Sequence, residues 1–393
     1  MPQTKPMEGN QAIAEGMRQI NPDVVAAYPI TPSTEVVQTF AGFVANGRVD
    51  TNFVAVESEH SAMSACTAAA IAGGRVMNAT SSQGLALMWE ILYITASLRA
   101  PVILTVVNRA LSGNINIHCD HSDTMGARDC GWIQLYGENV QEGYDNLLQA
   151  VRIGEHLGVR LPVMNCIDGF LVSHSYELLQ VEDDQAVKDF VGPYQAVRPL
   201  LDVRNPVSVG PLDLWDFYFE HKRGQMDAYP PAQEVITQVG KEFGQAFGRE
   251  YGLFEAYMLE DAEYAVVALG SAAGTAKDAV ESLRADGVKA GLLKLRAFRP
   301  FPAAEIAAAL AGKRAVAVFD RAVSFGAAAG PLFIEVVAAL YANRQAVPAV
   351  SCLFGLGGRE ITPEQFVEVF RQLPAVASAG QPTDPVQFVG LRQ

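Results

Sequence analysis

Two polar residues in this 393-residue sequence follow expected β-strands and have the chemistry to bind a small carboxylate. Thr31 lies in the segment 28–33 (YPITPS), and Arg109 ends the β-branched run 101–109 (PVILTVVNR). Open α/β sheets bind ligands at the carboxyl ends of their strands. There, Thr31 would offer a hydroxyl and a backbone N–H at a helix N-terminus, and Arg109 would pair with a carboxylate through two hydrogen bonds. On general grounds a proline-stiffened, capped turn explains Thr31 better, and an ion pair explains Arg109 equally well.

Glu59 is a third candidate, because it lies at the next strand-to-helix turn, in the segment 56–60 (VESEH). A carboxyl group held there, beside the apolar helix expected over 60–74, would be desolvated, which raises its pKa. Such a group suits proton exchange with a ring nitrogen. Acidic residues are also common in first helical turns, where they interact favourably with the helix dipole, and Glu57 is a rival for the same role.

Histidine, cysteine and aspartate residues gather in His118-Cys-Asp-His-Ser-Asp123, a spacing that resembles a metal-ligand box. This segment follows a loop and has no second cluster elsewhere, so we expect a polar, hydrogen-bonded loop at the edge of an active site or a subunit. Two glycine-rich segments are further candidates. The segment 270–274 (GSAAG) follows a strand and precedes a helix, which suits an anion, whereas 353–360 (LFGLGGRE) is best explained as a tight turn.

The surrounding sequence predicts the elements that would position these residues. Up to about residue 170, short apolar runs alternate with helical patterns, and a similar alternation resumes near residue 260. Continuous apolar strands are typical of a parallel sheet covered by helices on both faces. We therefore expect two α/β domains, a helical linker between them and a patternless tail that packs across a neighbouring chain. The expected ranges are 1–230 for the first domain, 231–259 for the linker, with one long helix over 233–258, 260–375 for the second domain and 376–393 for the tail.

Composition restricts the partners and the compartment. The formal net charge of −14 argues against nucleic acid as a partner. No run reaches the ~18 apolar residues that a membrane span needs, and the N-terminus lacks an apolar signal core, so we expect no membrane association and a cytoplasmic location. The scattered cysteines form no C-x-x-C pair, which predicts reduced thiols and no iron–sulfur cluster or structural zinc held by this chain alone. These cysteines are Cys66, Cys119, Cys130, Cys166 and Cys352.

Longer segments resemble a known family. The order and spacing of YPITPST (28–34), VESEHSAMSACTAAAIAGGR (56–75), ATSSQGLALMWE (79–90) and the segment from NRALS to GENVQE (108–142) resemble the α subunit of the 2-oxoacid:ferredoxin oxidoreductases, the pyruvate:ferredoxin oxidoreductase group in particular. The segment from ALGSAAG to RAFRPFP (268–302) resembles that subunit's second domain, which is itself similar to the C-terminal domain of transketolases. The resemblance covers about residues 10–375.

This resemblance implies a fold and an activity. The first domain would be a pyrimidine-binding domain of the thiamine-diphosphate fold. Glu59 would hydrogen-bond N1′ of the aminopyrimidine and drive ylide formation, and Thr31 and Arg109 would bind the substrate carboxylate. The implied reaction is oxidative decarboxylation of a 2-oxoacid, pyruvate first, to acyl-CoA and CO2 with electrons passed to ferredoxin, or the reverse carboxylation. Aryl- or branched-chain 2-oxoacids, 2-oxoglutarate and oxalate are the alternative substrates.

The resemblance further implies that this chain holds half of an active site. The family's diphosphate motif, G-D-G followed by an Asn-Asn pair, is absent from the sequence. Thiamine diphosphate would therefore be shared with a β subunit that binds the diphosphate and Mg²⁺. [4Fe-4S] clusters would lie on γ and δ (ferredoxin-like) subunits or their fused equivalents, with coenzyme A as co-substrate.

Two other classes of function stay open from the sequence. A transketolase-like or dehydrogenase-like thiamine enzyme without clusters would have a partner that lacks C-x-x-C motifs. A non-catalytic carboxylate-binding protein would bind a 2-oxoacid tightly without thiamine diphosphate.

Overall fold

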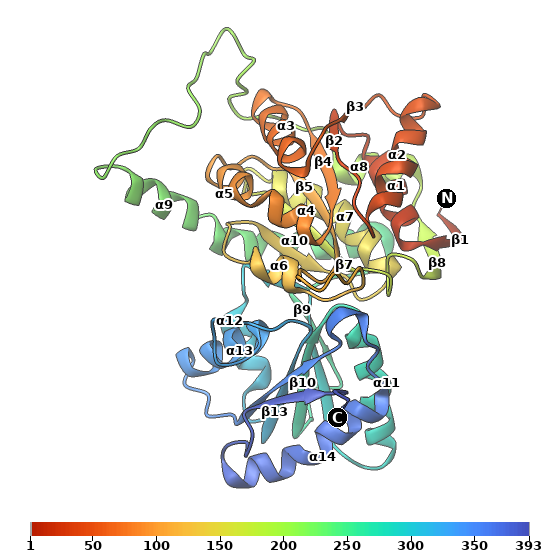
Figure 1. Ribbon diagram of the computed structural model, residues 1–393, viewed down its shortest axis with the longest axis vertical. Coiled ribbons are helices and arrows are strands. Elements are labelled where there is room, and N and C mark those ends of the chain that lie inside the picture. Colours follow the sequence, from red (N-terminus) through yellow and green to blue (C-terminus); the bar gives the residue numbers. More distant parts are fainter. Residues whose placement is uncertain (1, 393) are drawn as a thin grey trace.

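The computed structural model describes residues 2–392, which form two bodies stacked along the long axis of the molecule (Figure 1). Each body is built on a mainly parallel sheet with helices packed against it, as the alternating sequence pattern predicts. No helix within residues 2–392 is both long and apolar enough to cross a lipid bilayer.

The first sheet has seven strands in the order β12-β6-β7-β5-β4-β2-β3. Six of them run parallel, and only β12, at the edge, pairs antiparallel with β6. Every residue of β4, β5 and β7 is buried, which explains their continuous apolar runs in the sequence. The bounds are β2 Val24–Ala27, β3 Asn52–Ala55, β4 Val76–Thr80, β5 Ile103–Asn108, β6 Ile133–Tyr136, β7 Val163–Asp168 and β12 Ala297–Arg299.

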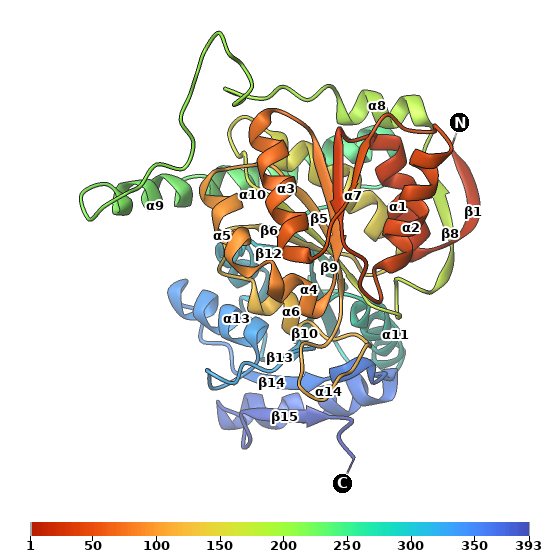
Figure 2. The same cartoon turned by 45° about the horizontal axis from the view of Figure 1, so that its top comes forward.

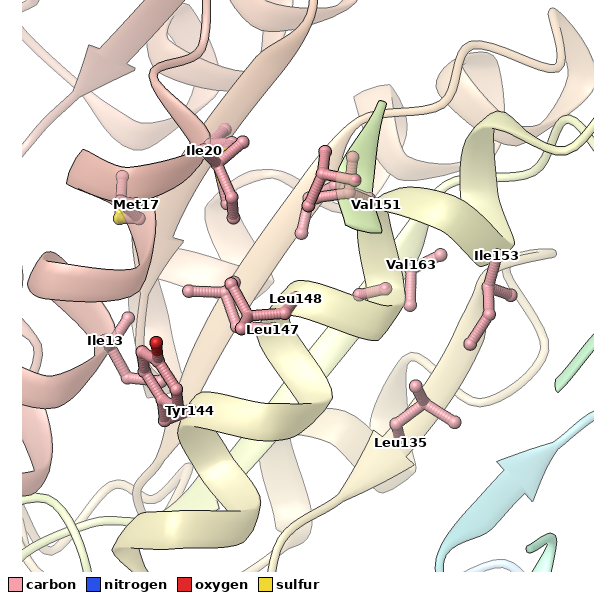
Figure 3. Close-up of a cluster of buried hydrophobic side chains, with 14 of the residues drawn as sticks. Ile13, Met17, Ile20, Leu135, Tyr144, Leu147, Leu148, Val151, Ile153 and Val163 are labelled. Carbon is pink, nitrogen blue, oxygen red and sulfur yellow. The ribbon is translucent and has the colours of Figure 1, made fainter. Parts of the chain in front are cut away.

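Helices cover both faces of this sheet (Figure 2). One face carries α1, α2, α7 and α10, and Figure 3 shows its core, where Ile13 and Met17 of α1 lie near Tyr144 and Leu147 of α7. The other face carries α3, α4 and α5. The bounds are α1 Gly9–Ile20, α2 Thr34–Ala45, α3 Glu59–Ala72, α4 Ser82–Leu87, α5 Trp89–Ser97, α6 Ser122–Gly126, α7 Val140–Glu155, α8 Asp184–Val191, α9 Tyr218–Met226 and α10 Tyr229–Phe247.

The second sheet has six strands in the order β15-β14-β13-β10-β11-β9, all parallel except β9. A separate antiparallel ladder joins β1 (Gln3–Glu8) to β8 (Tyr176–Val181). The bounds in the second body are β9 Phe254–Tyr257, β10 Tyr264–Leu269, α11 Ala272–Ala285, β11 Ala290–Leu295, α12 Ala303–Leu310, β13 Ala315–Asp320, α13 Pro331–Ala342, β14 Ala349–Phe354, α14 Pro363–Ala379 and β15 Val386–Val389.

Three segments differ from the sequence-based expectation. The long helix expected over 233–258 ends at Phe247, because Gly248 adopts a left-handed conformation and the chain then turns into β9. The tail expected to lack a pattern forms β15, which pairs with β14 of the same chain. One strand also crosses between the two bodies, since β12 lies within the sequence of the second body but joins the edge of the first sheet.

Residues 193–217 connect α8 to α9 without any helix or strand and extend away from the first body (Figures 1 and 2). This arm exposes large apolar side chains, and Trp215 is 92% exposed. Others of this kind are Leu201, Val203, Leu212 and Leu214.

Candidate active site

The three residues predicted for chemistry all lie at the carboxyl edge of the first sheet. Thr31 follows β2, Glu59 is the first residue of α3 after β3, and Arg109 follows β5. Because these strands are parallel, their carboxyl ends meet at one edge, which is where open α/β sheets bind ligands. The sequence-based choice of positions therefore corresponds to one region of the fold.

Thr31 and Arg109 are in direct contact. The buried Arg109 guanidinium donates through Nη1 to the backbone oxygen of Thr31 at 2.9 Å and through Nε to that of Asn116 at 3.2 Å. Burial lowers the pKa of Arg109, and the nearby Asp123 opposes that shift. No carboxylate within residues 2–392 forms an ion pair with this guanidinium, so the ion-pair explanation of Arg109 does not apply within the chain.

The turn after β2 does not use Thr31 as its cap. Ser33 occupies the N-cap position of α2, and its hydroxyl donates back to Ile30 rather than capping the helix. The Thr31 hydroxyl makes no hydrogen bond with the described residues, and the residue is exposed. The hydroxyl is therefore available to a ligand beside Arg109.

Glu59 is buried at the base of the same edge. Ser58 caps α3 by accepting a hydrogen bond from the backbone N–H of Ser61, which fixes Glu59 in the first helical turn. The Glu59 carboxylate is 6% exposed and makes no hydrogen bond or ion pair with the described residues. Glu57 points to solvent, and its hydrogen bond from Ser61 lowers its pKa.

Helix α4 packs directly on this carboxylate. A Cβ atom added at Gly84 would lie 2.9 Å from Glu59 Oε1 and 2.5 Å from Thr80 Oγ1, so only glycine fits there without displacing a neighbour. The buried hydroxyl groups of Thr80 and Ser81 have no hydrogen-bond partner within the described residues. Polar groups left unpartnered in a buried site are expected to meet a ligand or water.

The segment His118–Asp123 is a hydrogen-bonded loop beside the site, as the sequence predicts. Asp123 is buried, and its carboxylate accepts the backbone N–H groups of Ser82 and Arg109, each at 3.0 Å. Burial raises the pKa of Asp123 to about 6, although its N–H donors oppose the shift. The sequence marks Asp123 only as a member of a polar cluster, because nothing local indicates which distant N–H groups it accepts.

This segment does not form the metal box that its spacing resembles. Potential ligand atoms of Cys119, His121 and Asp168 lie within 4.8 Å of one another. Asp168, however, already accepts hydrogen bonds from His121 at 2.7 Å and from the Ser271 hydroxyl at 2.6 Å. Arg321 Nε lies 3.9 Å from the same carboxylate, so a cation there would meet a guanidinium.

Both glycine-rich segments make hydrogen bonds to other parts of the chain. The α11 N-terminus that follows Gly270 is already capped, because Asp168 accepts the backbone N–H of Ser271 at 3.1 Å. The turn after β14 contacts the loop 118–123 of the first body, since the backbone N–H of Gly358 donates to the backbone oxygen of Cys119 at 2.6 Å. The tight-turn interpretation of 353–360 is therefore confirmed, and the anion suited to 270–274 is the protein's own carboxylate.

Two family models match the chain. Residues 15–241 match the thiamine-diphosphate-binding domain of pyruvate flavodoxin/ferredoxin oxidoreductases, and residues 262–366 match core domain II of pyruvate:ferredoxin oxidoreductase. Together they cover both bodies of the fold.

Curated relatives match over nearly their full lengths. A pyruvate synthase subunit PorA from Thermotoga maritima is 52% identical over 98% of this chain and 97% of the relative, and one from Methanocaldococcus jannaschii is 41% identical over 100% and 99%. A ketoisovalerate oxidoreductase subunit VorA from Pyrococcus abyssi is 39% identical over 100% and 99%.

Solved structures share the fold at lower identity. A 2-oxoglutarate:ferredoxin oxidoreductase from Magnetococcus marinus superposes with a TM-score of 0.73 at 21% identity, over 94% of this chain and 65% of that chain. A split-gene transketolase superposes with a TM-score of 0.53 at 12% identity, over 95% and 98%.

Proposed function

The chain belongs to the pyruvate:ferredoxin oxidoreductase family, and on that basis we propose that it is the α subunit of a multi-subunit enzyme that oxidatively decarboxylates pyruvate to acetyl-CoA and CO2, or runs the reverse carboxylation. The observation that carries the proposal is the meeting of Thr31, Arg109 and Glu59 at one edge of the first sheet. A carboxylate-binding group and a buried acid would then share the edge where ligands bind.

Arg109 and Thr31 would bind the carboxylate of the 2-oxoacid. The two hydrogen bonds to backbone oxygens use two of the five guanidinium N–H donors, which leaves donors for a substrate and fixes the orientation of the plane. Because Arg109 is 8% exposed and has no acidic partner within the described residues, its charge is not neutralised before a substrate arrives. Charge-assisted bonds of this kind are roughly twice as strong as neutral ones.

Thiamine diphosphate is the cofactor that the family implies, and the residues present fit it. Glu59 is buried without a partner within the described residues, and Gly84 keeps its Oε1 atom uncovered by a side chain. When bound, the cofactor supplies an electron sink that allows a 2-oxoacid to lose CO2. The role of Glu59 would be to hold a proton between its carboxylate and N1′ of the aminopyrimidine ring, which requires an acid shielded from water.

The rest of the active site would lie on partner subunits. The five cysteines are all buried and unpaired, and none of the spacings suits a cluster. The sequence also lacks the family's diphosphate motif. We therefore assign the diphosphate and Mg²⁺ to a β subunit, and the [4Fe-4S] clusters to γ and δ subunits or their fused equivalents that pass electrons to ferredoxin.

Pyruvate is the preferred substrate of the proposal, because the relatives with 40–52% identity are pyruvate synthase subunits. The ketoisovalerate relative, at 39%, matches as well as several pyruvate relatives do. Branched 2-oxoacids are therefore the competing substrates, and residues 111–118, which lie next to Arg109, are the segment expected to select among them.

The test is reconstitution of the chain with its β, γ and δ partners, followed by metal, sulfide and thiamine analysis and by assay with pyruvate, a branched 2-oxoacid and 2-oxoglutarate. We expect coenzyme A-dependent reduction of a viologen dye with pyruvate by the complex and none by the isolated chain. Turnover by the isolated chain, or tight 2-oxoacid binding by a chain that forms no complex and needs no thiamine diphosphate, would contradict the proposal.

A further inference from the structure

We propose that Asp123 is a positioning residue that joins the backbone of Arg109 to the start of α4, and so holds the substrate-binding and cofactor-binding sides of the site in a fixed relative position. The inference rests on the proposed function, because it takes Arg109 and Glu59 as the groups that contact substrate and cofactor. Its experiment is chosen so that the two can fail separately.

The Asp123 carboxylate has a complete set of donors. Its Oδ2 atom accepts the backbone N–H groups of Arg109 and Ser82, each at 3.0 Å. Its Oδ1 atom accepts the Asn108 side-chain amide at 2.8 Å and the backbone N–H of Thr124 at 2.7 Å. Because the Asp123 side chain is almost fully buried, its hydrogen bonds are shielded from water and are strong. One oxygen atom therefore links two chain segments that belong to opposite sides of the site.

The Ser82 end of this link is held in an uncommon backbone conformation. Ser82 has φ +45°, in the left-handed region that non-glycine residues rarely adopt, and it is the first residue of α4. Such a conformation is energetically unfavourable and persists only where the surroundings fix it. Two residues further along α4, Gly84 packs against Glu59 Oε1. The bond between Ser82 and Asp123, together with the bond that the Ser82 hydroxyl donates to the backbone oxygen of Ala110 at 2.6 Å, thus helps to set the position of α4 and of the space beside Glu59.

The segment that carries Asp123 is anchored on the second body. The His121 backbone N–H donates to the backbone oxygen of Arg321 at 2.8 Å, while the His121 side chain contacts Asp168, at the end of β7 in the first sheet, at 2.7 Å. The backbone of Cys119 accepts a hydrogen bond from Gly358. The second body therefore supplies a fixed base for Asp123, although none of the three proposed site residues lies in it.

The experiment compares D123N with D320N in the reconstituted complex. Asp320 is the matched control, because it is also a buried carboxylate that accepts two backbone N–H groups, those of Leu332 and Phe333, but it ends β13 of the second body and reaches the start of α13 there. We expect D123N to raise KM for pyruvate about tenfold, the value for loss of one charge-assisted bond, and to raise the concentration of thiamine diphosphate needed for half-maximal reconstitution by a similar factor. We expect kcat and the KM for the viologen dye to change less than about threefold.

The control separates positioning from general destabilisation. D320N is expected to lower thermal stability to a similar extent while leaving both KM values and the thiamine diphosphate requirement unchanged. An active wild-type complex in which D123N leaves KM for pyruvate unchanged overturns the positioning role alone. A wild-type complex that turns over no 2-oxoacid overturns the proposed function instead.

Amide hydrogen exchange gives a second measurement that needs no turnover, and its wild-type arm needs no folded variant. In the full wild-type chain, the backbone amides of Ser82 and Arg109 are expected to be protected well above exposed loop amides. Loss of that protection in D123N but not in D320N supports the inference. Exchange of both amides at the rate of exposed loop amides in the wild type overturns it.

Discussion

At the scale of single residues, Glu57 and Glu59 differ in their surroundings rather than in their chemistry. Glu57 is exposed and accepts a hydrogen bond from Ser61, which lowers its pKa. Glu59 is buried, without a hydrogen-bond or ion-pair partner within the described residues. Only the second environment gives an acid that can exchange a proton with a bound ring out of contact with water.

The substitution E59Q therefore tests the role of this acid. An amide of nearly the same shape fills the space but cannot carry the proton, so we expect turnover with pyruvate to fall roughly 10²–10⁴-fold while the complex still assembles. Steady-state kinetics and gel filtration measure the two effects. E57Q is the control and is expected to leave turnover within about twofold; a larger loss in E57Q than in E59Q would reassign the acid.

The two carboxylate-binding residues are expected to contribute unequally. R109A removes a charge-assisted pair, worth roughly 1.5–3 kcal/mol, whereas T31V removes a neutral hydroxyl contact of about 1 kcal/mol. KM for pyruvate should therefore rise roughly ten- to a hundred-fold in R109A and a few-fold in T31V. Both variants must first be shown to assemble. Unchanged KM values in assembled R109A and T31V complexes would place the carboxylate site elsewhere.

At the scale of elements, the short helix α4 shapes the site because it has a glycine, without a side chain, where it faces Glu59. Gly84 faces Glu59 and Thr80 so closely that no side chain fits between them. Helix α4 ends at Leu87 and α5 begins at Trp89, with Met88 between them. The contact between α4 and α3 brings this glycine against the carboxylate.

The substitution G84A tests this packing. The added methyl group must displace the Glu59 carboxylate or the Thr80 hydroxyl, at an overpacking cost of about 1–3 kcal/mol. Because the Glu59 side chain is the more flexible of the two, we expect turnover to fall about ten-fold or more, with a smaller effect on assembly.

G42A provides the control for a helical glycine. A Cβ atom at Gly42, inside α2, has nothing within 4 Å, so alanine should leave turnover unchanged and should stabilise the chain by roughly 0.5–1 kcal/mol. If G84A retains wild-type turnover while G42A behaves as stated, the close contact between α4 and Glu59 does not matter for function.

At the scale of the whole molecule, one buried carboxylate joins the two bodies. Asp168 ends β7 of the first sheet, yet it caps α11 of the second body through Ser271 and contacts His121. Burial alone would raise the pKa of Asp168, but His121, Arg321 and Ser271 outweigh it and hold that pKa below its usual range. The Asp168 carboxylate is therefore ionised at neutral pH.

The substitution D168N should weaken this joint in a pH-dependent way. At pH 7 we expect the free energy of unfolding to fall by roughly 3–5 kcal/mol, the cost of breaking a buried pair. Because the folded pKa is depressed, the stability that Asp168 contributes is present above its unfolded pKa of about 3.9 and is lost as pH falls below that value. Denaturation of wild type and D168N at pH 7 and pH 3 should thus give a smaller difference at pH 3.

An exposed ion pair supplies the comparison for this prediction. Asp261 binds Arg284 at 2.8 Å on the surface, where water screens the charges. D261N is therefore expected to leave the free energy of unfolding nearly unchanged at either pH. A difference between wild type and D168N that stays constant or grows on acidification would contradict the ionised joint.

The sequence by itself determined the α/β class and the positions of Thr31, Glu59 and Arg109. The fold class follows from local signals, because buried parallel strands appear as continuous apolar runs. The three positions do as well, because each residue follows a segment that the sequence predicts to be a strand. Strand ends of a parallel sheet meet at one edge in any such fold, so local position was enough to bring Thr31 and Arg109 together. Composition and the missing motifs further restricted which partners to expect.

Only the tertiary structure decided how the site is held. The N–H donors of Asp123 come from residues up to 41 positions away, and Asp168 caps a helix that begins 103 positions later. The edge strands β9 and β15 likewise lie where the sequence predicts a long helix and a patternless tail, because an edge strand is selected by the sheet that it joins. A local pattern reports whether a residue is buried, but the partner that satisfies a buried carboxylate or an edge strand depends on which distant segments the fold brings alongside it.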